Sequence, residues 1–207
     1  MYHNSINFQA NKRKTKNGNE YCHTNNALAV GGTTCALATG LSALITHKKN
    51  IPNSKKTILA WFGLTAPLIL MGAIADKLTN KERQKAADLI AEVGVEQAQL
   101  IDKNLKVSKN GNLYKQTANG TIAAAIGTFS VLALSGVSHL LLKKGVVKNE
   151  IFKHFNKIFE LGCEMGGGDE LAVFIGSLPA TLPFLPLIGS DWLNKKQAEK
   201  NSWKIKF

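Results

Sequence analysis

Residue types that could bind a metal or form disulfides are scattered along the chain. The three cysteines, Cys22, Cys35 and Cys163, form no C-x-x-C pair, and their spacing predicts no disulfide framework. Cys22 and His23, together with His3, could be imagined as metal ligands. No second spaced pair accompanies them, and a solvated tail is the simpler interpretation. We therefore predict no metal site and no bound cofactor.

Catalytic motifs are equally sparse. Glu164, Asp169 and Glu170 surround a run of three glycines at 166–168, just before an apolar stretch. Acid pairs can coordinate cations, but they more often cap a helix N-terminus. The glycine run has none of the flanking residues of a phosphate-binding loop, and the chain contains no nucleophile elbow, H-E-x-x-H or kinase signature. We expect that the protein is not an enzyme and has no catalytic residues.

Four uncharged, mainly apolar stretches dominate the chain, at 27–46, 58–75, 121–142 and 171–189. Each has about 18–22 residues and, at about 1.5 Å per residue, would span about 27–33 Å, the hydrocarbon thickness of a bilayer. None contains Asp, Glu, Lys or Arg, and His139 is the only titratable base inside them. The pattern predicts four transmembrane helices in an all-α, polytopic membrane protein.

Two other interpretations of these stretches fit the sequence less well. A soluble helical bundle would show a polar face on helices of this length, but the first stretch has only hydroxyl groups, on Thr33, Thr34, Thr39 and Ser42. Those hydroxyls can bond to carbonyls of the preceding turn. A cleaved signal peptide would have a shorter apolar run and a shorter segment before it, so a retained anchor is favoured.

A motif of the form K-N-G-N-x-Y-x-x-T occurs twice, at 16–24 and 109–117, before the first and third apolar stretches. The similarity continues where TGLS at 39–42 parallels SGVS at 135–138, and each pair of stretches is followed by an aspartate. Matches at fixed spacing indicate an internal repeat. Each unit has two stretches, an even number, so the units would enter the membrane from the same side as tandem helical hairpins, a parallel repeat. Both termini would then lie on one side.

The repeat divides the chain into five parts. We expect a polar basic N-terminal arm at 1–26, a first helical hairpin at 27–78, a connector at 79–120, a second helical hairpin at 121–192 and a basic tail at 193–207. The connector is predicted to begin a separate helix at a capping box formed by Thr79 and Glu82. Asn-Gly at the centre of the motif favours a tight β-hairpin, and pairing between the two hairpins is left open.

The longer loop of the second helical hairpin is predicted to form a basic amphipathic helix. Its apolar positions recur at helical spacing from Val147 to Phe159, opposite Lys148, Lys153 and Lys157. Such a helix suits the plane of the lipid head groups.

The charge of the chain indicates its partner. Lys plus Arg number 26 against 14 for Asp plus Glu, giving a formal net charge of +12. The basic residues lie between the apolar stretches rather than on one folded face, which favours a lipid bilayer with anionic head groups over nucleic acid. The positive-inside rule then places both termini in the cytoplasm, and we expect a bacterial inner membrane.

Two classes of function remain. A structural or protein-interaction role would use small residues for close helix packing, within the chain or in a homo-oligomer, and the candidate positions are Gly32, Gly40, Gly127 and Gly136. A small transporter or channel is the alternative, with a site where prolines interrupt the second and fourth stretches, and its candidates are Pro67, Pro179, Pro183, Pro186 and His139. The lack of an acid–base pair inside the stretches weighs against ion-coupled transport. A membrane-perturbing role of the amphipathic helix is a third hypothesis.

Overall fold

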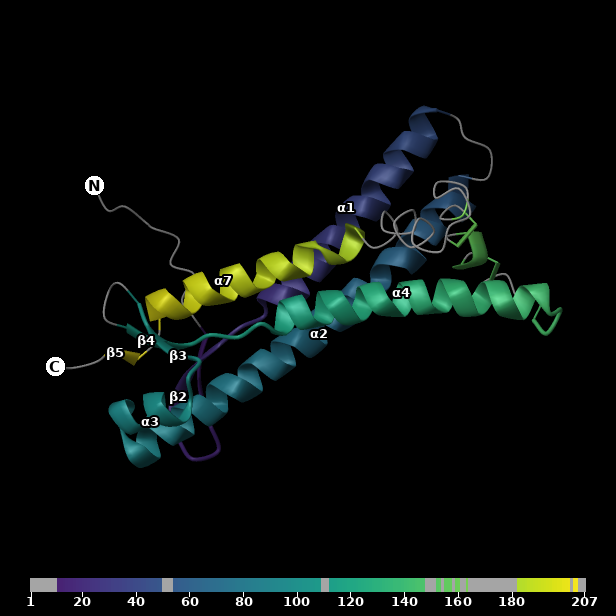
Figure 1. Ribbon diagram of the computed structural model, residues 1–207. Helices are drawn as coiled ribbons and strands as arrows, with labels where there is room; N and C mark the ends of the chain where they lie inside the picture. Colours follow the sequence, from purple (N-terminus) through teal and green to yellow (C-terminus); the bar gives the residue numbers. More distant parts are fainter. Residues whose placement is uncertain are drawn as a thin grey trace, which may run out of the picture.

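Helices form most of the computed structural model, which describes residues 11–49, 54–108, 112–147, 152–153, 155–157, 159–160, 163, 182–201 and 203–204 (Figure 1). The main helices are α1 (Asn26–Lys48), α2 (Ser54–Val93), α3 (Val95–Ile101), α4 (Asn119–Lys143) and α7 (Pro186–Asn201). The strands are β1 (Asn11–Lys14), β2 (Glu20–His23), β3 (Leu105–Val107), β4 (Asn112–Lys115) and β5 (Trp203–Lys204). The predicted helical class is therefore confirmed, with small β-sheets added at one end.

Helix α2 is continuous over 40 residues and contains both the second apolar stretch and the start of the connector. The predicted capping box at Thr79 is wrong, because the helix passes through this position and the Thr79 side chain is fully buried. No glycine or proline occurs between 73 and 93, so the sequence there contains no helix breaker. The boundary expected between 78 and 79 falls inside α2.

Helices α1 and α4 are the two described helices that are long and apolar enough to cross a membrane. Their large side chains point outward: Leu37 and Leu44 on α1 are 60% and 68% exposed, and Phe129 on α4 is 68% exposed. The buried face of α1 consists of small residues instead, namely Ala27, Gly31, Cys35, Ser42 and Thr46. Small residues inside and large apolar residues outside is the reverse of a soluble helical bundle.

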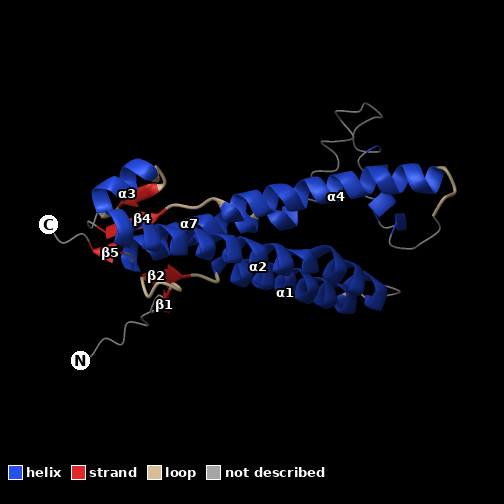
Figure 2. Ribbon diagram, turned by 90° about the horizontal axis from the view of Figure 1, so that it is seen from below, coloured by secondary structure: helices blue, strands red, loops and turns tan. Residues whose placement is uncertain are grey.

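Helix α1 packs closely along α2 (Figure 2). A Cβ atom on Gly31 would collide with the backbone carbonyl of Leu68, and one on Gly72 would collide with the carbonyl of Ala27. The two backbones therefore approach each other at a distance that only glycine permits at these positions.

Four helices meet at the end of the molecule that carries the sheets. There α1 and α4 both contact α2 and α7, while α4 diverges from α1 and α2 toward the other end (Figures 1 and 2). The apolar side chains buried at this meeting point are Ala27, Leu68, Ala75, Ala123, Ala124, Val131, Phe184 and Leu187. They come from both sequence halves, which share one core.

The repeated motif forms a β-hairpin in the first copy, with Gly18 at φ 85° in the turn between β1 and β2. In the second copy β3 and β4 also pair antiparallel, and the turn at 109–111 lies outside the described residues. The two hairpins belong to separate sheets, and β4 pairs with β5 instead. Pairing between the hairpins, which the sequence left open, does not occur among the described strands.

The fourth predicted span is represented only by its last part. Positions 171–181, with Pro179, lie outside the described residues. Residues 182–184 form a 3-10 turn that contains Pro183, and α7 begins at Pro186. Within the described residues, the chain at 182–185 is therefore not α-helical.

Candidate functional site: a buried polar layer at the helix junction

Buried and half-buried polar side chains gather where α1 and α4 begin and where α2 and α7 pass them. We call this set the junction layer, and its members are Thr24, Asn26, Asp76, Thr79, Asn80, Arg83, Asn119, Asp191 and Asn194. Thr24, Thr79, Arg83 and Asn194 are at most 2% exposed. Buried polar groups are costly unless they are hydrogen-bonded, so their partners decide what the layer does.

Two aspartates cap the two apolar helices from neighbouring helices. Asp76 on α2 accepts hydrogen bonds from the backbone N–H groups of Ala27 and Leu28, at 3.1 and 2.8 Å. Asp191 on α7 accepts them from Gly120 and Thr121, at 2.9 and 2.7 Å. Neither α1 nor α4 has an acidic residue in its first turn or a side-chain cap of its own. The two carboxylates therefore satisfy N–H groups that the helices leave open, where the helix dipole favours negative charge.

Burial raises the pKa of Asp76, while its two backbone hydrogen bonds and the charge of Arg83 oppose that rise. Asp191 is only partly buried, and it also accepts a hydrogen bond from the hydroxyl of Thr121 at 2.7 Å. The two caps thus share a geometry but differ in solvent access.

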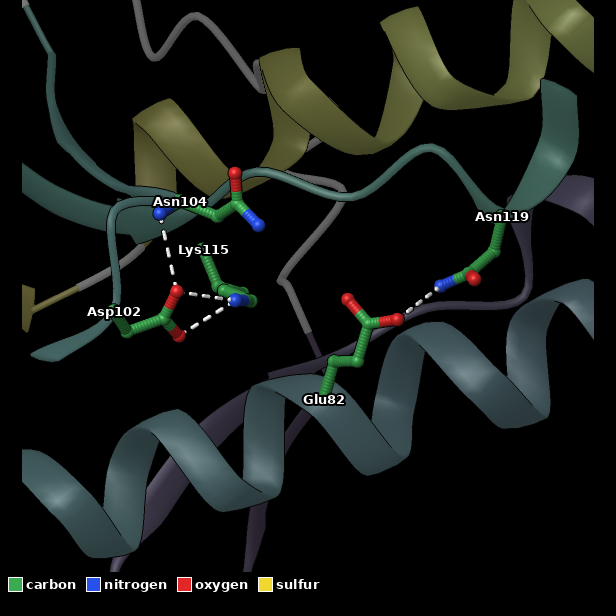
Figure 3. A network of polar contacts seen from close by, with 5 residues as sticks. All are labelled: Glu82, Asp102, Asn104, Lys115 and Asn119. Atoms are coloured by element: carbon green, nitrogen blue, oxygen red, sulfur yellow. Dashed lines mark hydrogen bonds and ion pairs between the residues drawn. The ribbon is translucent and has the colours of Figure 1, made fainter. Parts of the chain in front are cut away.

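Two asparagines connect the sequence halves in a reciprocal way. Asn26 at the start of α1 donates to the side-chain oxygen of Asn194 on α7, at 2.9 Å. Asn119 at the start of α4 donates to Thr79 on α2 at 3.2 Å, and to the Glu82 carboxylate at 3.1 Å (Figure 3). Both asparagines occupy the same place after the two motif copies, and Thr79 and Asn194 each stand three residues after a capping aspartate. In each half, the asparagine after the motif therefore contacts the residue that stands three positions after the capping aspartate of the other half.

The motif tyrosines dock the β-hairpins onto helices. The Tyr21 hydroxyl accepts a hydrogen bond from Gln84 on α2 at 2.8 Å. Tyr114 hydrogen-bonds to Glu199 on α7, and burial together with this carboxylate raises the pKa of Tyr114. Gln84 and Glu199 each lie eight residues after a capping aspartate. In both motif copies the tyrosine hydroxyl thus bonds to the equivalent helix position, as acceptor from Gln84 and as donor to Glu199.

Arg83 distinguishes the first half from the second. Its guanidinium is 2% exposed and donates to the backbone carbonyls of Cys22 on β2 and Asn194 on α7, both at 2.9 Å. Burial lowers the pKa of Arg83, and the negative charge of Asp76 opposes this. In the described part of the chain, no carboxylate lies within ion-pair distance of it. The corresponding position after Asp191 is the buried Ala198, so the second half has no equivalent charge.

The second hairpin carries its own partly buried ion pair. Lys115 on β4 binds the Asp102 carboxylate at 2.7 Å, and the backbone N–H of Asn104 donates to the same carboxylate at 3.0 Å (Figure 3). Lys115 is only 9% exposed, and it occupies the motif position that Cys22 has in the first copy. The two hairpins are therefore held by different charged groups, Arg83 in one case and Lys115 in the other.

His23 lies at the edge of the junction layer as a neutral ring. Asn80 accepts the backbone N–H of Thr24 and donates to its carbonyl, both at 2.9 Å, which fixes the orientation of the amide. The Asn80 amide nitrogen then faces His23 Nε2 at 3.3 Å, so Nε2 acts as the acceptor. Burial lowers the pKa of His23, and the nearby charges of Arg13 and Arg83 lower it further.

A carboxylate on α2 holds the turn of the first hairpin. Asp88 accepts hydrogen bonds from the Thr15 hydroxyl at 2.7 Å and from the Asn19 amide at 2.8 Å. These hydrogen bonds hold the pKa of Asp88 below its usual value. The K-N-G-N turn is therefore attached to the distal part of α2.

His139 and Pro67, two of the residues proposed for transport, are not members of the junction layer. His139 bonds through Nδ1 to the Asn156 side chain at 3.0 Å and stacks on Phe159, with ring centroids 4.3 Å apart. Pro67 is exposed on α2.

The proposed packing glycines separate into two groups. A Cβ on Gly127 would collide with the Phe184 ring, so α4 lies against Phe184 at this position. Gly32, Gly40 and Gly136 have no described atom within 4 Å of such a Cβ, so they do not join the described helices. The glycines at the other close contacts are Gly31, Gly72 and Gly120.

The described contacts of the junction layer join helices and hairpins of the same chain. In the described part of the chain no group of three His, Cys, Asp or Glu side chains could hold a metal ion.

Sequence reasoning missed Asn26, Asn80, Arg83, Asn119 and Asn194. One signal for two of them was available, since an asparagine follows both motif copies at the same distance.

No protein-family model, curated protein or solved structure matches this chain. The function must therefore be argued from the chain's own contacts.

Proposed function

We propose that this chain is an integral membrane protein with a structural or protein-interaction role. The observation that carries the proposal is the outward orientation of the large apolar side chains on α1 and α4, such as Leu44 and Phe129. In water each square ångström of such surface would cost about 25 cal/mol. Monomeric soluble proteins rarely expose a continuous apolar surface of this kind, whereas a bilayer covers it.

The hydroxyl groups on these helices support a lipid environment. Thr34, Ser42 and Ser135 donate to carbonyls of their own helix, at 2.9, 2.8 and 2.7 Å. In hydrocarbon no water is present to accept these hydrogen bonds, so internal partners are needed. The contacts of Thr34 and Ser42 are those expected from the sequence.

Four spans in two tandem helical hairpins remain our proposal for the topology. Helices α1 and α4 would be the first and third spans, the apolar part of α2 the second, and the segment leading into α7 the fourth. The matching roles of Asp76 and Asp191, and of Tyr21 and Tyr114, support a duplicated unit with parallel orientation. The β-sheets and the junction layer would then lie on one side, which we assign to the cytoplasm of a bacterial inner membrane.

The scaffold character of the junction layer favours a structural role. Its described contacts hold helices and hairpins of the same chain together, and we propose lipids with anionic head groups and other membrane proteins, including further copies of the chain, as partners. Binding of nucleic acid is not part of the proposal.

Membrane extraction and cysteine labelling test this proposal together. The chain should stay with the membrane pellet after alkaline carbonate, and its release as soluble protein would overturn the proposal. In a Cys163→Ser background, cysteines introduced at the exposed positions Lys16 and Lys106 should react with an impermeant maleimide from one side. A cysteine at the exposed Lys48 should react from the other side, and labelling of all three from one side would contradict the topology.

A small transporter or channel is the second candidate, and one observation favours it. The described end of the fourth apolar stretch is a 3-10 turn at 182–184 rather than an α-helix, and such breaks can line a substrate site. Solute flux into liposomes should then change in Pro67→Ala and Pro183→Ala variants that keep the wild-type melting temperature. Wild-type protein without flux of any tested solute would leave the structural role alone.

A further inference from the structure

The exposed charges next to the capping aspartates all have one sign. In the turns after Asp76 and Asp191, the exposed charged side chains are Lys77, Lys81, Lys195 and Lys196. The one acidic residue in positions 77–82 and 192–197 is Glu82, which is half-buried and accepts the amide of Asn119. The exposed surface of α2 and α7 just after the capping aspartates is therefore basic.

Lys81 and Lys196 occupy equivalent places in the two halves. Each stands five residues after a capping aspartate, and each is exposed. Five residues of helix advance about 7.5 Å along the axis. The head-group layer on one side of a bilayer is about 5–8 Å thick, so both lysines would reach the level of the phosphates.

Trp192 marks the same level on α7. Its side chain is 56% exposed although it directly follows the capping Asp191. The Lys196 ammonium lies over its ring, 3.8 Å from the centroid. An exposed tryptophan with a lysine one turn further out is typical of the boundary between hydrocarbon and head groups.

The two lysines belong to different helices of the junction. Helix α2 carries Lys81 and α7 carries Lys196, and α1 and α4 each contact both of these helices. Both lysines are exposed, and phosphate groups of separate lipid molecules could reach each of them. We infer that this level of the protein binds the phosphate groups of anionic phospholipids, with Lys81 and Lys196 as equivalent contacts. This inference rests on the proposed membrane location.

The test measures the melting temperature of the purified full-length chain in a neutral detergent, with added phosphatidylglycerol or phosphatidylcholine. Phosphatidylglycerol should raise the melting temperature more than phosphatidylcholine does. The double variant Lys81→Gln/Lys196→Gln should lose most of this difference. The matched control Lys103→Gln/Lys106→Gln removes the same charge from exposed positions of the β3 region and should keep the difference.

A charge-preserving variant distinguishes the loss of the lysine charges from a general loss of stability. Lys81→Arg/Lys196→Arg should keep the preference for phosphatidylglycerol. The inference is overturned if the glutamine variant keeps the full difference, if the wild-type chain shows none, or if inorganic phosphate raises the melting temperature as much as the lipid does. A chain that resists carbonate extraction but shows no lipid preference contradicts this inference alone, whereas an extractable chain contradicts the membrane proposal.

Discussion

Arg83 on α2 donates a hydrogen bond to the backbone carbonyl of Asn194 on α7, at 2.9 Å, and so connects the two sequence halves. The same guanidinium holds the carbonyl of Cys22 on β2. Three separate segments thus depend on one buried side chain. Replacing it with Met keeps much of the volume but leaves both carbonyls without their donor.

We expect Arg83→Met to lower the free energy of unfolding by about 1–3 kcal/mol, the usual cost of leaving a buried polar group unsatisfied. Melting temperatures in detergent would measure this. The control is Lys85→Met on the same helix, where the side chain is exposed and the change should be small. Equal effects of the two substitutions would contradict the role of Arg83.

The two capping aspartates should both contribute to stability. Asp76→Ala and Asp191→Ala each remove acceptors from two backbone N–H groups, and loss of a cap costs about 0.5–2 kcal/mol. Asp76 is 4% exposed and Asp191 is more accessible, so water can replace the second cap more easily and Asp76→Ala should cost more. Thermal melting of the two variants checks this order, and a larger loss for Asp191→Ala would be evidence against it.

Gly31 and Gly32 are neighbours with opposite surroundings. A Cβ on Gly31 would collide with the Leu68 carbonyl, whereas one on Gly32 would meet no described atom within 4 Å. Gly31→Ala should therefore destabilise the chain by about 1–3 kcal/mol through overpacking. Gly32→Ala should be neutral or slightly stabilising, since alanine is the better helix former. Indistinguishable melting curves would show that α1 and α2 are not in close contact.

The two motif tyrosines can be compared by removing one oxygen from each. Tyr114→Phe takes a hydrogen bond from the carboxylate of Glu199, and Tyr21→Phe takes one from the neutral amide of Gln84. Bonds to charged groups are worth about 1.5–3 kcal/mol and neutral ones about 0.5–1.5 kcal/mol, so Tyr114→Phe should be the more destabilising. Denaturation in detergent measures both, and the reverse order would contradict the assigned partners.

Acid should weaken the contact between the first hairpin and α2. The pKa of His23 is lowered in the folded chain, so the folded state disfavours the proton. The contribution of the neutral ring is therefore complete above the unfolded value of about 6.5 and is lost as the pH falls below it. A proton on Nε2 would also place a donor against the Asn80 amide.

The measurement is the melting temperature between pH 7.5 and 5.5, compared with a His23→Gln variant. Glutamine can still accept from Asn80 but does not titrate, so its curve should be flatter. Asp88, whose pKa is lowered, would contribute only at a more acidic pH. Parallel curves for wild type and variant would exclude His23 as the source of the pH dependence.

The sequence predicted the helices more reliably than their limits. Length and apolar composition located α1 and α4, and the Asn-Gly pair located the first hairpin turn. The capping box at Thr79 failed because a cap forms only where a helix begins, and the chain before Thr79 is already helical. A local pattern cannot reveal that continuity.

The junction layer was harder to predict because its contacts join distant segments. Asp76 was recognised as a repeated position, but its actual partners are 48 and 49 residues earlier in the chain. Arg83 has no counterpart in the second half, so a comparison of the copies gave no signal for it. Comparison of the two repeat copies did supply a list of matching positions. Several residues at these positions make contacts in the junction layer.

The continuity of α2 has a mechanical consequence. At about 1.5 Å per residue its 40 residues extend about 60 Å, twice the hydrocarbon thickness of a bilayer. Its distal end carries β2 and α3. On the proposed topology, the apolar part of α2 lies in the bilayer and the rest of the same helix extends beyond it. Because α2 is one continuous helix, a rotation of its apolar part would also move the first hairpin and α3, which contact its other end.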